Sequence, residues 1–433
     1  FASVEVGWKS QLYLTLTGRN DWASQLAGSP QKSFFYPSVG LSWLPSETFD
    51  FPELFPYLKL RGSWASVGVP FPRELTYPTH PYDHTTSGWD DKTNRPIGDL
   101  YPERTKSWEL GFDARFLNGF TLTASWYRAD TYNQTFNPNI SASSGWSDMY
   151  VQTGHVRNTG VEAMLGYTHT WRGFTWDSAV TFSWNKNKIV ELMRNWRDPE
   201  TGKVYSKDRL EIKGLGRAKY ILKEGGSMGD LYTTSDLRRN ADGDDRDRRR
   251  GHGSPSEEQP CRRMKLGSVF PKYNLSWRNT FDYKGVKLSA LVTARIGGIV
   301  YSATQANMDL FGVSEASAAA RDRGGVLLNG RSMVDAETWY TAIGAQSGLP
   351  QYYTYSATNV RLQELSVGYT IPRRWLKVCD ITVSLVGRNL WMMYCKAPFD
   401  PEAVASTENF YQGIDYFMTP SLRNIGFNVN IKF

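Results

Sequence analysis

The last ten residues of the chain, 424–433, alternate strictly between polar and apolar side chains and end on an aromatic ring. Their apolar face consists of Ile425, Phe427, Val429, Ile431 and Phe433. A period of two predicts a strand with one buried face, which occurs in soluble sheets and in membrane barrels alike. Because the same alternation recurs along the whole chain, the pattern favours a transmembrane β-barrel.

Thirteen segments alternate in this way, and helical periodicity is nearly absent. The segments are 1–8, 11–19, 35–44, 56–67, 105–116, 119–131, 156–169, 173–189, 271–283, 285–297, 357–371, 379–390 and 422–433. Most of them reach the length of about nine to eleven residues that a tilted strand needs to cross a bilayer, which exceeds the usual soluble strand. The predicted fold class is therefore all-β, an antiparallel transmembrane β-barrel.

Charged side chains occur on the polar faces of these segments. They are Lys59, Arg61, Glu109, Asp113, Glu162, Arg278, Arg295 and Arg388. A water-filled lumen can solvate such charges, whereas the packed core of a soluble sandwich could not. We therefore expect the polar faces to point into the barrel.

The composition agrees with a barrel and excludes a helical membrane protein. The mean hydropathy is −0.48, and the chain has no run of about 18 apolar residues, which a spanning helix would need. Aromatic residues make up 14% of the chain, with 16 Trp and 24 Tyr, which suits two interfacial rings around a lipid-facing band. The net charge of +7 comes from Lys and Arg that are mostly interleaved with Asp and Glu, so nucleic-acid binding is not expected.

The connections between the segments are alternately short and long, as in bacterial barrels with periplasmic turns and extended extracellular loops. The long ones are 20–34, 68–104, 132–155, 190–270, 298–356 and 391–421. If the short joins are periplasmic, Phe433 lies in the periplasm. Since a single-chain bacterial barrel normally has an even number of strands, thirteen segments predict that further strands complete it. No signal peptide occurs and Phe1 begins strand-like sequence, so we expect an N-terminal portion to precede it.

Several stretches together resemble the SusC/RagA-type TonB-dependent transporters of Bacteroidetes, almost from end to end. They include FYPSVGLSW (35–43), LKLRGSW (58–64), PERTKSWELG (102–111), NTGVE (158–162), GSMGDLY (226–232), KLGSVFPKYN (265–274), VRLQELSVGY (360–369), GRNL (387–390) and the closing 427–433. Each stretch is weak alone, but their number and order make the resemblance specific.

The resemblance implies that residues 1–433 form the C-terminal part of a barrel of about 22 strands, without its N-terminal plug. It further implies TonB-dependent import of glycan fragments or peptides across the Gram-negative outer membrane, with a SusD-like surface lipoprotein over the barrel. The TonB complex would act through the missing N-terminal part, and membrane lipid would surround the wall. Phe433 would belong to the signal that the barrel-assembly machinery reads. No enzymatic activity and no cofactor are implied.

One stretch, 236–264, departs from the family because it is rich in Arg and Asp. Asn240, Asp242, Asp244, Asp245 and Asp247 resemble calcium ligands, but the glycine and the bidentate Glu of an EF-hand are missing, so a solvated loop is expected. His80 and His84 surround Pro81, which disfavours a helical metal site. Cys261, Cys379 and Cys395 are read as free thiols, although Cys261 and Cys395 could meet if their loops share a side.

Aromatic residues of the expected loops are the candidates for ligand contact. We single out Trp89, Trp146, Tyr150, Tyr352 and Tyr353, since such rings can stack on sugars or hold a peptide, although anchoring and packing also explain them. The leading functional hypothesis is nutrient import. A SusC-like barrel that acts as a structural scaffold in a larger outer-membrane complex, and a soluble β-rich carbohydrate-binding protein, remain alternatives.

Overall fold

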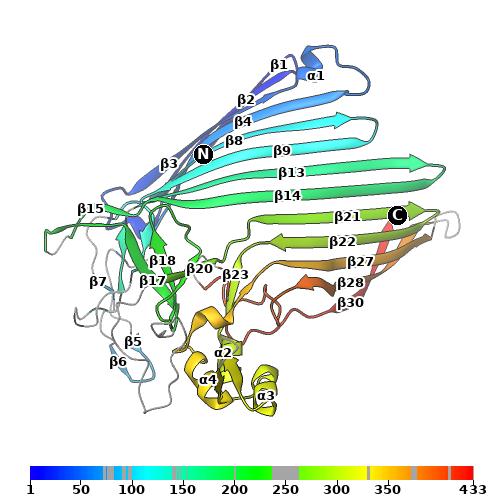
Figure 1. The fold of residues 1–433 in the computed structure, drawn as a ribbon. Coiled ribbons are helices and arrows are strands. Elements are labelled where there is room, and N and C mark those ends of the chain that lie inside the picture. Colours follow the sequence, from blue (N-terminus) through cyan, green and yellow to red (C-terminus); the bar gives the residue numbers. More distant parts are fainter. Residues whose placement is uncertain are drawn as a thin grey trace.

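The computed structural model describes residues 1–71, 75, 82–89, 94–95, 100–138, 143, 146, 148–152, 154–198, 201–236, 263–328, 332–371, 378–407 and 411–432. In this part, thirteen strands form one sheet in which every neighbouring pair is antiparallel (Figure 1). In order they are β1 (Ala2–Trp8), β2 (Leu12–Trp22), β3 (Ser33–Trp43), β4 (Tyr57–Val69), β8 (Glu103–Phe116), β9 (Phe120–Tyr132), β13 (His155–Trp171), β14 (Phe174–Glu191), β21 (Tyr273–Tyr283), β22 (Val286–Ile296), β27 (Asn359–Ile371), β28 (Asp380–Cys395) and β30 (Asn424–Lys432). Each of the thirteen predicted segments is confirmed as a strand of this sheet.

Tight turns join strands at one end of the sheet, on the right in Figure 1. Two-residue turns lie at 172–173 and 284–285, where all four residues have positive φ angles between 47° and 89°. Such mirror-image turns match the twist of the flanking strands. Gly285 is required there, because a Cβ would come within 2.9 Å of the Thr370 carbonyl oxygen. Within the described residues, the short joins predicted from the sequence thus lie at one end.

The cross-strand register places apolar side chains in continuous rows on one face. One row runs through Leu60, Phe112, Ala124, Ala163, Phe182, Leu275, Ala294 and Val360. Near the turns, Phe116, Phe120, Tyr167 and Trp176 form a chain of ring contacts with centroids 4.5–5.6 Å apart. The rows extend the alternation of single strands over the whole wall, and the ring chain agrees with one of the predicted aromatic rings.

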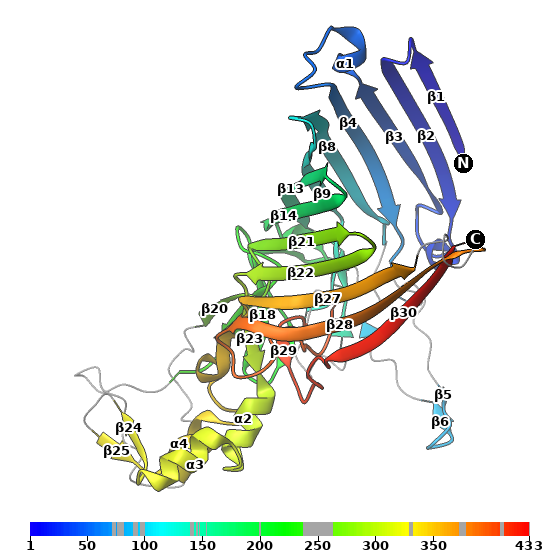
Figure 2. The same cartoon turned by 90° about the vertical axis from the view of Figure 1, so that its right-hand side faces the viewer.

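The sheet is an open trough rather than a closed barrel (Figure 2). β1 pairs only with β2, and β30 pairs only with β28, among the described residues. Both strands therefore present one row of unpaired main-chain N–H and C=O groups, which a bilayer interior does not tolerate.

The long connections gather at the opposite end and contain structure of their own. β17 (Arg209–Leu215), β18 (Ala218–Lys223), β19 (Asp230–Thr233) and β20 (Met264–Ser268) form a small sheet, and β23 (Ile299–Ser302), β26 (Thr354–Ser356) and β29 (Ile414–Asp415) form another. Two-stranded pairs are made by β5 (Tyr82–Asp83) with β6 (Gly88–Trp89), β7 (Asn94–Arg95) with β11 (Asp148–Met149), β10 (Thr135–Phe136) with β12 (Val151–Gln152), β15 (Met193–Arg197) with β16 (Val204–Lys207), and β24 (Val326–Leu328) with β25 (Ser332–Val334). The loops are thus folded segments.

Helices also occur in the connections, although helical periodicity is nearly absent from the sequence. They are α1 (Pro45–Thr48), α2 (Ala303–Leu310), α3 (Glu315–Asp322) and α4 (Ala336–Ile343), with 3₁₀ turns η1 (Ser24–Leu26) and η3 (Pro350–Tyr353). The side chains of Ser302, Ser314 and Asp335 cap α2, α3 and α4. Eight residues make only about two turns, which is too short for a periodic signal. The N-cap residues were therefore the sequence feature that indicated these helices.

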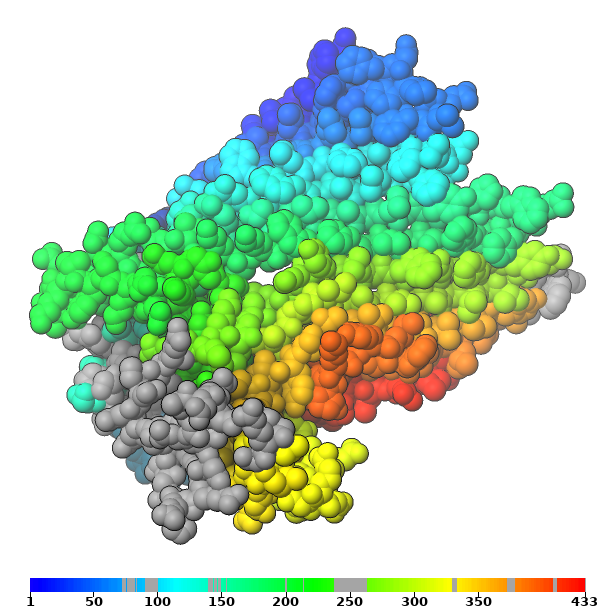
Figure 3. Space-filling model, in the orientation of Figure 1, coloured from blue at the N-terminus to red at the C-terminus, as the bar shows by residue number. Residues whose placement is uncertain are grey.

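The largest cluster of buried residues lies mainly among these connections, and from the wall it includes Val156 and Ile189 at the loop ends of β13 and β14. It includes Leu192, Tyr220, Leu222, Leu231, Val269, Tyr301, Tyr353 and Ile414. In Figure 3, the connections between β14 and β21 and between β22 and β27 lie together at one end of the wall. Their packing gives the loops a fixed shape.

Candidate functional site: the inner wall

A row of polar side chains crosses the concave face of the sheet, opposite to the apolar rows. Glu162 on β13 stands opposite Ser125 on β9 and Ser183 on β14. Ser183 stands opposite Asn274, which stands opposite Arg295 on β22. The row follows from alternation, because each of these positions is one residue from an apolar-row position.

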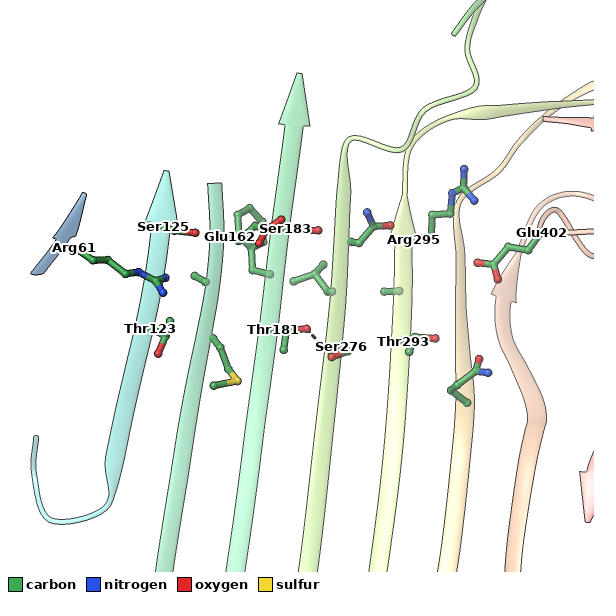
Figure 4. A pocket seen from close by; sticks show the side chains of 17 residues that line it. Arg61, Thr123, Ser125, Glu162, Thr181, Ser183, Ser276, Thr293, Arg295 and Glu402 are labelled. Atoms are coloured by element: carbon green, nitrogen blue, oxygen red, sulfur yellow. Dashed lines mark hydrogen bonds between the residues drawn. The ribbon is translucent and has the colours of Figure 1, made fainter. Parts of the chain in front are cut away.

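These residues line a cavity of about 720 Å³ (Figure 4). Its polar lining consists of Arg61, Thr123, Ser125, Glu162, Thr181, Ser183, Asn274, Ser276, Thr293, Arg295, Gln363 and Glu402. The lining extends from β4 to β27, and the strands between them follow one another in the sheet. At about 4.8 Å per strand, seven strand spacings give roughly 34 Å along the wall. The site is therefore suited to an elongated ligand.

Arg61 lies across the wall because Gly111 leaves room for it. A Cβ at Gly111 would come within 2.5 Å of the Arg61 Nε and 3.1 Å of its Nη2. In Figure 4 the guanidinium points toward Thr123 and Ser125 of β9. The Nε is buried and has no hydrogen-bond partner among the described residues, and the Nη2 lies 4.0 Å from a Glu109 carboxylate oxygen. Arg61 therefore keeps donors available for a ligand.

Hydroxyl groups occupy the middle of the cavity. Thr181 and Ser276 share a hydrogen bond of 2.6 Å between their oxygens, while Ser125, Ser183 and Thr293 show no side-chain bond within the described part of the chain. A hydroxyl both donates and accepts. This surface can therefore meet the amides of a peptide or the hydroxyls of a sugar equally well.

A buried ion-pair network closes the loop end of the site. The Arg361 Nη2 lies 2.7 Å from the Asp400 Oδ1 and 3.3 Å from a Glu402 oxygen, and the Arg361 side chain is only 3% exposed. The Arg361 Nε donates to the Asn359 Oδ1 at 3.1 Å. Burial alone would raise the pKa of the Asp400 carboxyl, but hydrogen bonds from Arg361 and Ser421 hold it below its ordinary value. We name Arg361, Asp400, Glu402 and Ser421 the loop latch, because they fasten the segment after β28 to β27.

Arg295 lines the cavity, as does Glu402 of the latch. The Arg295 Nη2 donates to the Val269 carbonyl at 3.3 Å, and its Nε is buried with no partner in the described part of the chain. Glu402 belongs both to the latch and to the cavity lining. The sequence named Arg61, Glu162 and Arg295 as lumen-facing charges, and the structure brings all three to one cavity. The sequence analysis did not identify Gln363 and Glu402 as lining residues. Glu402 is in a loop, and no sequence pattern connects that loop to the wall.

The aromatic candidates lie elsewhere, and none of the five side chains lines this cavity. Trp89 is 72% exposed and packs edge-on against Tyr82 in the β5–β6 hairpin. Tyr150 packs against a small cluster that contains Leu26 and Phe71, and Trp146 is partly buried. Ligand contact by these residues stays a prediction.

Tyr352 and Tyr353 lie together in η3 but differ in exposure. The Tyr352 ring is 40% exposed and contacts Trp339 edge-on, with centroids 5.4 Å apart. The Tyr353 side chain is 2% exposed in the main loop cluster, so its ring offers no free face in this arrangement. Tyr353 therefore supports the loop fold.

Other sequence candidates fall outside the described residues or remain single groups. Phe433, His80, Cys261 and the Asn/Asp run at 240–247 are not described. Cys379 and Cys395 are free thiols. Among the described residues, no three His, Cys, Asp or Glu side chains are grouped as for a metal ion, and no helix there is long and apolar enough to cross a membrane.

Comparisons with known proteins agree with this architecture. The family model for TonB dependent receptor-like β-barrels matches residues 1–390. TonB-dependent receptors P3 and P26 of Formosa agariphila are 26% and 25% identical to this chain, cover all of it, and are themselves covered over 45% and 46% of their lengths. The chain thus spans less than half the length of these relatives.

Solved structures share the fold. The RagAB peptide transporter matches with a TM-score of 0.70 and 17% identity, over 99% of this chain and 47% of that one. The RagAB peptide importer in its closed-closed state matches with a TM-score of 0.69 and 16% identity, over the same shares of the two chains. At such low identity, the likeness concerns the path of the backbone.

Proposed function

The chain belongs to the TonB-dependent receptor-like β-barrel family, and we propose from this membership that residues 1–433 form the C-terminal part of the wall of an outer-membrane importer of oligomeric nutrients. The observation that carries the proposal is the polar inner wall. A cavity lined by hydroxyls, amides and four charged groups, opposite an apolar outer face, is the arrangement of a wall between lipid and a watery passage.

The rest of the importer is part of the same proposal. The two open edges, β1 and β30, would pair with strands from the remainder of the longer protein, which would also supply the plug and the segment that contacts TonB. The folded loops would meet a SusD-like surface lipoprotein. The relatives' lengths and the need to pair every edge in a bilayer support this.

The ligand is proposed to be an extended oligomer, either a peptide or a glycan fragment. Two of the structural relatives are named as a peptide importer and a peptide transporter, which favours a peptide as the first to be tested. The lining itself favours neither class, because hydroxyls and amides bind both. No chemistry on the ligand is proposed, since the wall offers binding groups only.

The test compares uptake by cells that carry the full-length protein with uptake by cells that lack it, using defined oligopeptides and oligosaccharides. The full-length variants R61Q and E162Q should bind the imported oligomer about tenfold more weakly, because each loses one charge-assisted hydrogen bond. R172Q, which removes a charge from a turn, is the matched control and should bind normally.

The alternative is a scaffold role, which predicts a different outcome. A scaffold would assemble with its partners in the outer membrane, yet deletion would leave uptake unchanged, and no oligomer would bind to the purified protein. If R61Q, E162Q and R172Q bind the oligomer equally well and uptake is intact, the import function would stand. The inner wall would then be ruled out as the ligand site.

A further inference from the structure

A second charged surface lies on the apolar face of the wall, at the end that carries the long connections. Its position follows from the register of β8, β9, β13 and β14, which lie side by side in Figure 1. On this outer face, one row reads Leu110, Trp126, Val161 and Trp184; the next reads Trp108, Arg128, Thr159 and Lys186; and the third reads Lys106, Asp130, Arg157 and Lys188. The apolar band thus gives way to a cluster of cations.

We name Lys106, Arg128, Arg157, Lys186 and Lys188 the outer basic patch. A single carboxylate, that of Asp130, lies among these five cations. Its Oδ2 accepts a hydrogen bond from the Arg128 Nε at 2.8 Å, and its Oδ1 accepts one from the Arg157 Nε at 2.7 Å. The ring of His155 also contacts Oδ1, at 2.5 Å. The patch therefore carries a clear excess of positive charge.

Asp130 leaves most of the donors in the patch unused. It engages only the Nε of each arginine, so the terminal Nη groups of Arg128 and Arg157 have no partner in the described part of the chain. Lys186 and Lys188 are exposed and make no ion pair there, and Lys106 contacts only the face of the Tyr132 ring, at 5.6 Å. Asp130 holds the Nε of each arginine, and the Nη donors of both guanidinium groups are left for another acceptor.

In the described part of the sheet, the cluster of cations does not continue onto the next two strands. On the next strands, the residues level with Trp184 are Tyr273 and Ile296, and both are uncharged. At the turn end, Lys9, Arg172 and Lys284 are isolated, and each lies over the ring of the preceding residue, at 4.8, 5.3 and 5.0 Å. Ordinary anchoring at the interface explains such single cations, but it does not explain five on four adjacent strands.

We propose that the outer basic patch binds the phosphate-bearing headgroup of a lipid in the outer leaflet, with the acyl chains of the lipid against Leu110, Trp126, Val161 and Trp184. Guanidinium forks bind phosphate oxygens in pairs and lysines add point charges, and basic patches beside a lipid-facing surface recognise anionic headgroups. The proposal requires that the wall lies in the outer membrane, but it does not require nutrient import.

The test measures lipid binding to the full-length protein in detergent by native mass spectrometry. The probe is a phosphorylated glucosamine glycolipid, compared with its dephosphorylated form. The variant K106Q/K186Q/K188Q leaves the Asp130 contacts intact. We expect it to bind the phosphorylated lipid about 100-fold more weakly, since each cation near a membrane surface contributes about a fivefold step and the three steps multiply. The control K9Q/R172Q/K284Q removes the same charge from the turn end and should bind as the unmodified protein does.

Three results would overturn the proposal. They are equal affinity of the triple variant and the unmodified protein, equal affinity for the dephosphorylated lipid, and displacement by inorganic phosphate at the concentration of the lipid, which would indicate a free anion as the ligand. A heat-modifiable band on gels verifies that each variant has folded. Uptake that is the same in cells with and without the protein, while the purified protein still binds the lipid, would contradict only the proposed import function.

Discussion

At the scale of single residues, two glycines decide how long side chains lie on the inner wall. A Cβ at Gly111 would come within 2.5 Å of the Arg61 Nε, and one at Gly160 within 2.4 Å of the Tyr127 ring. Each glycine therefore lets a neighbouring side chain lie flat along the sheet instead of projecting into the lumen. The glycine and the side chain above it form one unit, although they are on different strands.

We predict that G111A weakens ligand binding by about tenfold, as R61Q does, because the new methyl group displaces the guanidinium. The double variant G111A/R61Q should bind no more weakly than R61Q alone, since both changes remove the same contact. Isothermal titration with the imported oligomer measures this. G40A is the control, because its Cβ would meet only the Thr15 Cβ, at 3.9 Å. Additive losses would refute the coupling.

At the scale of elements, the wall and its connections are stabilised differently. Wall strands are held by ladders of main-chain hydrogen bonds, whereas the connections pack around their own buried cluster. The loop latch joins the two, since Arg361 belongs to β27 and Asp400 to the segment after β28. Because Arg361 is 3% exposed, removing the Asp400 charge leaves this buried cation with only the half-exposed Glu402 as a carboxylate partner, which is strongly destabilising.

We predict that the latch weakens in acid. The pKa of Asp400 lies below its ordinary value of 3.8, so the unfolded segment takes up a proton at a higher pH than the folded one. The stabilisation is therefore complete above about pH 4 and is lost as the pH falls below it toward the lowered pKa. Hydrogen exchange of residues 398–407 as a function of pH should reveal this loss.

The variant D400N should lower the free energy of opening of the same segment by about 3 kcal/mol already at neutral pH. It should also remove the acid dependence of that opening. E402Q is the comparison, because the Glu402 side chain is 39% exposed and its pair should be worth less than about 1 kcal/mol. Equal protection in D400N and the unmodified protein would mean that the latch does not hold the segment.

At the scale of the whole molecule, the open edges set the condition for stability in a membrane. β1 and β30 each lack a partner on one side in the described structure, and each unsatisfied main-chain group in lipid costs several kcal/mol. The outer face adds a second requirement for a membrane, since exposed aromatic rings and aliphatic side chains cover it. We therefore expect that the wall is stable only when further strands pair with both edges.

We predict that residues 1–433 expressed alone do not assemble in the outer membrane, whereas the full-length protein does. The measurement is the heat-modifiable, denaturant-resistant band that folded barrels give on gels, combined with protease protection in intact cells. A protected monomer formed by residues 1–433 alone would contradict the prediction and would require that this sheet closes on itself.

The sequence by itself determined the thirteen strands, their polar and apolar faces and the end at which the turns lie. These features are local, because alternation and turn residues act within about ten residues of chain. They were confirmed for the described residues, and Arg61, Glu162 and Arg295 were correctly assigned to one face. The helices α2 to α4 were missed because eight residues carry too little periodic signal.

Only the tertiary structure decided which distant residues meet. Charges that look interleaved along the chain become clustered once the register places Lys106 and Lys188 in one row. The register likewise assembles the inner cavity, and loop packing brings Glu402 to Arg361. Alternation fixes the face on which a side chain lies, but cross-strand pairing fixes its neighbours, and pairing depends on segments far apart in the sequence.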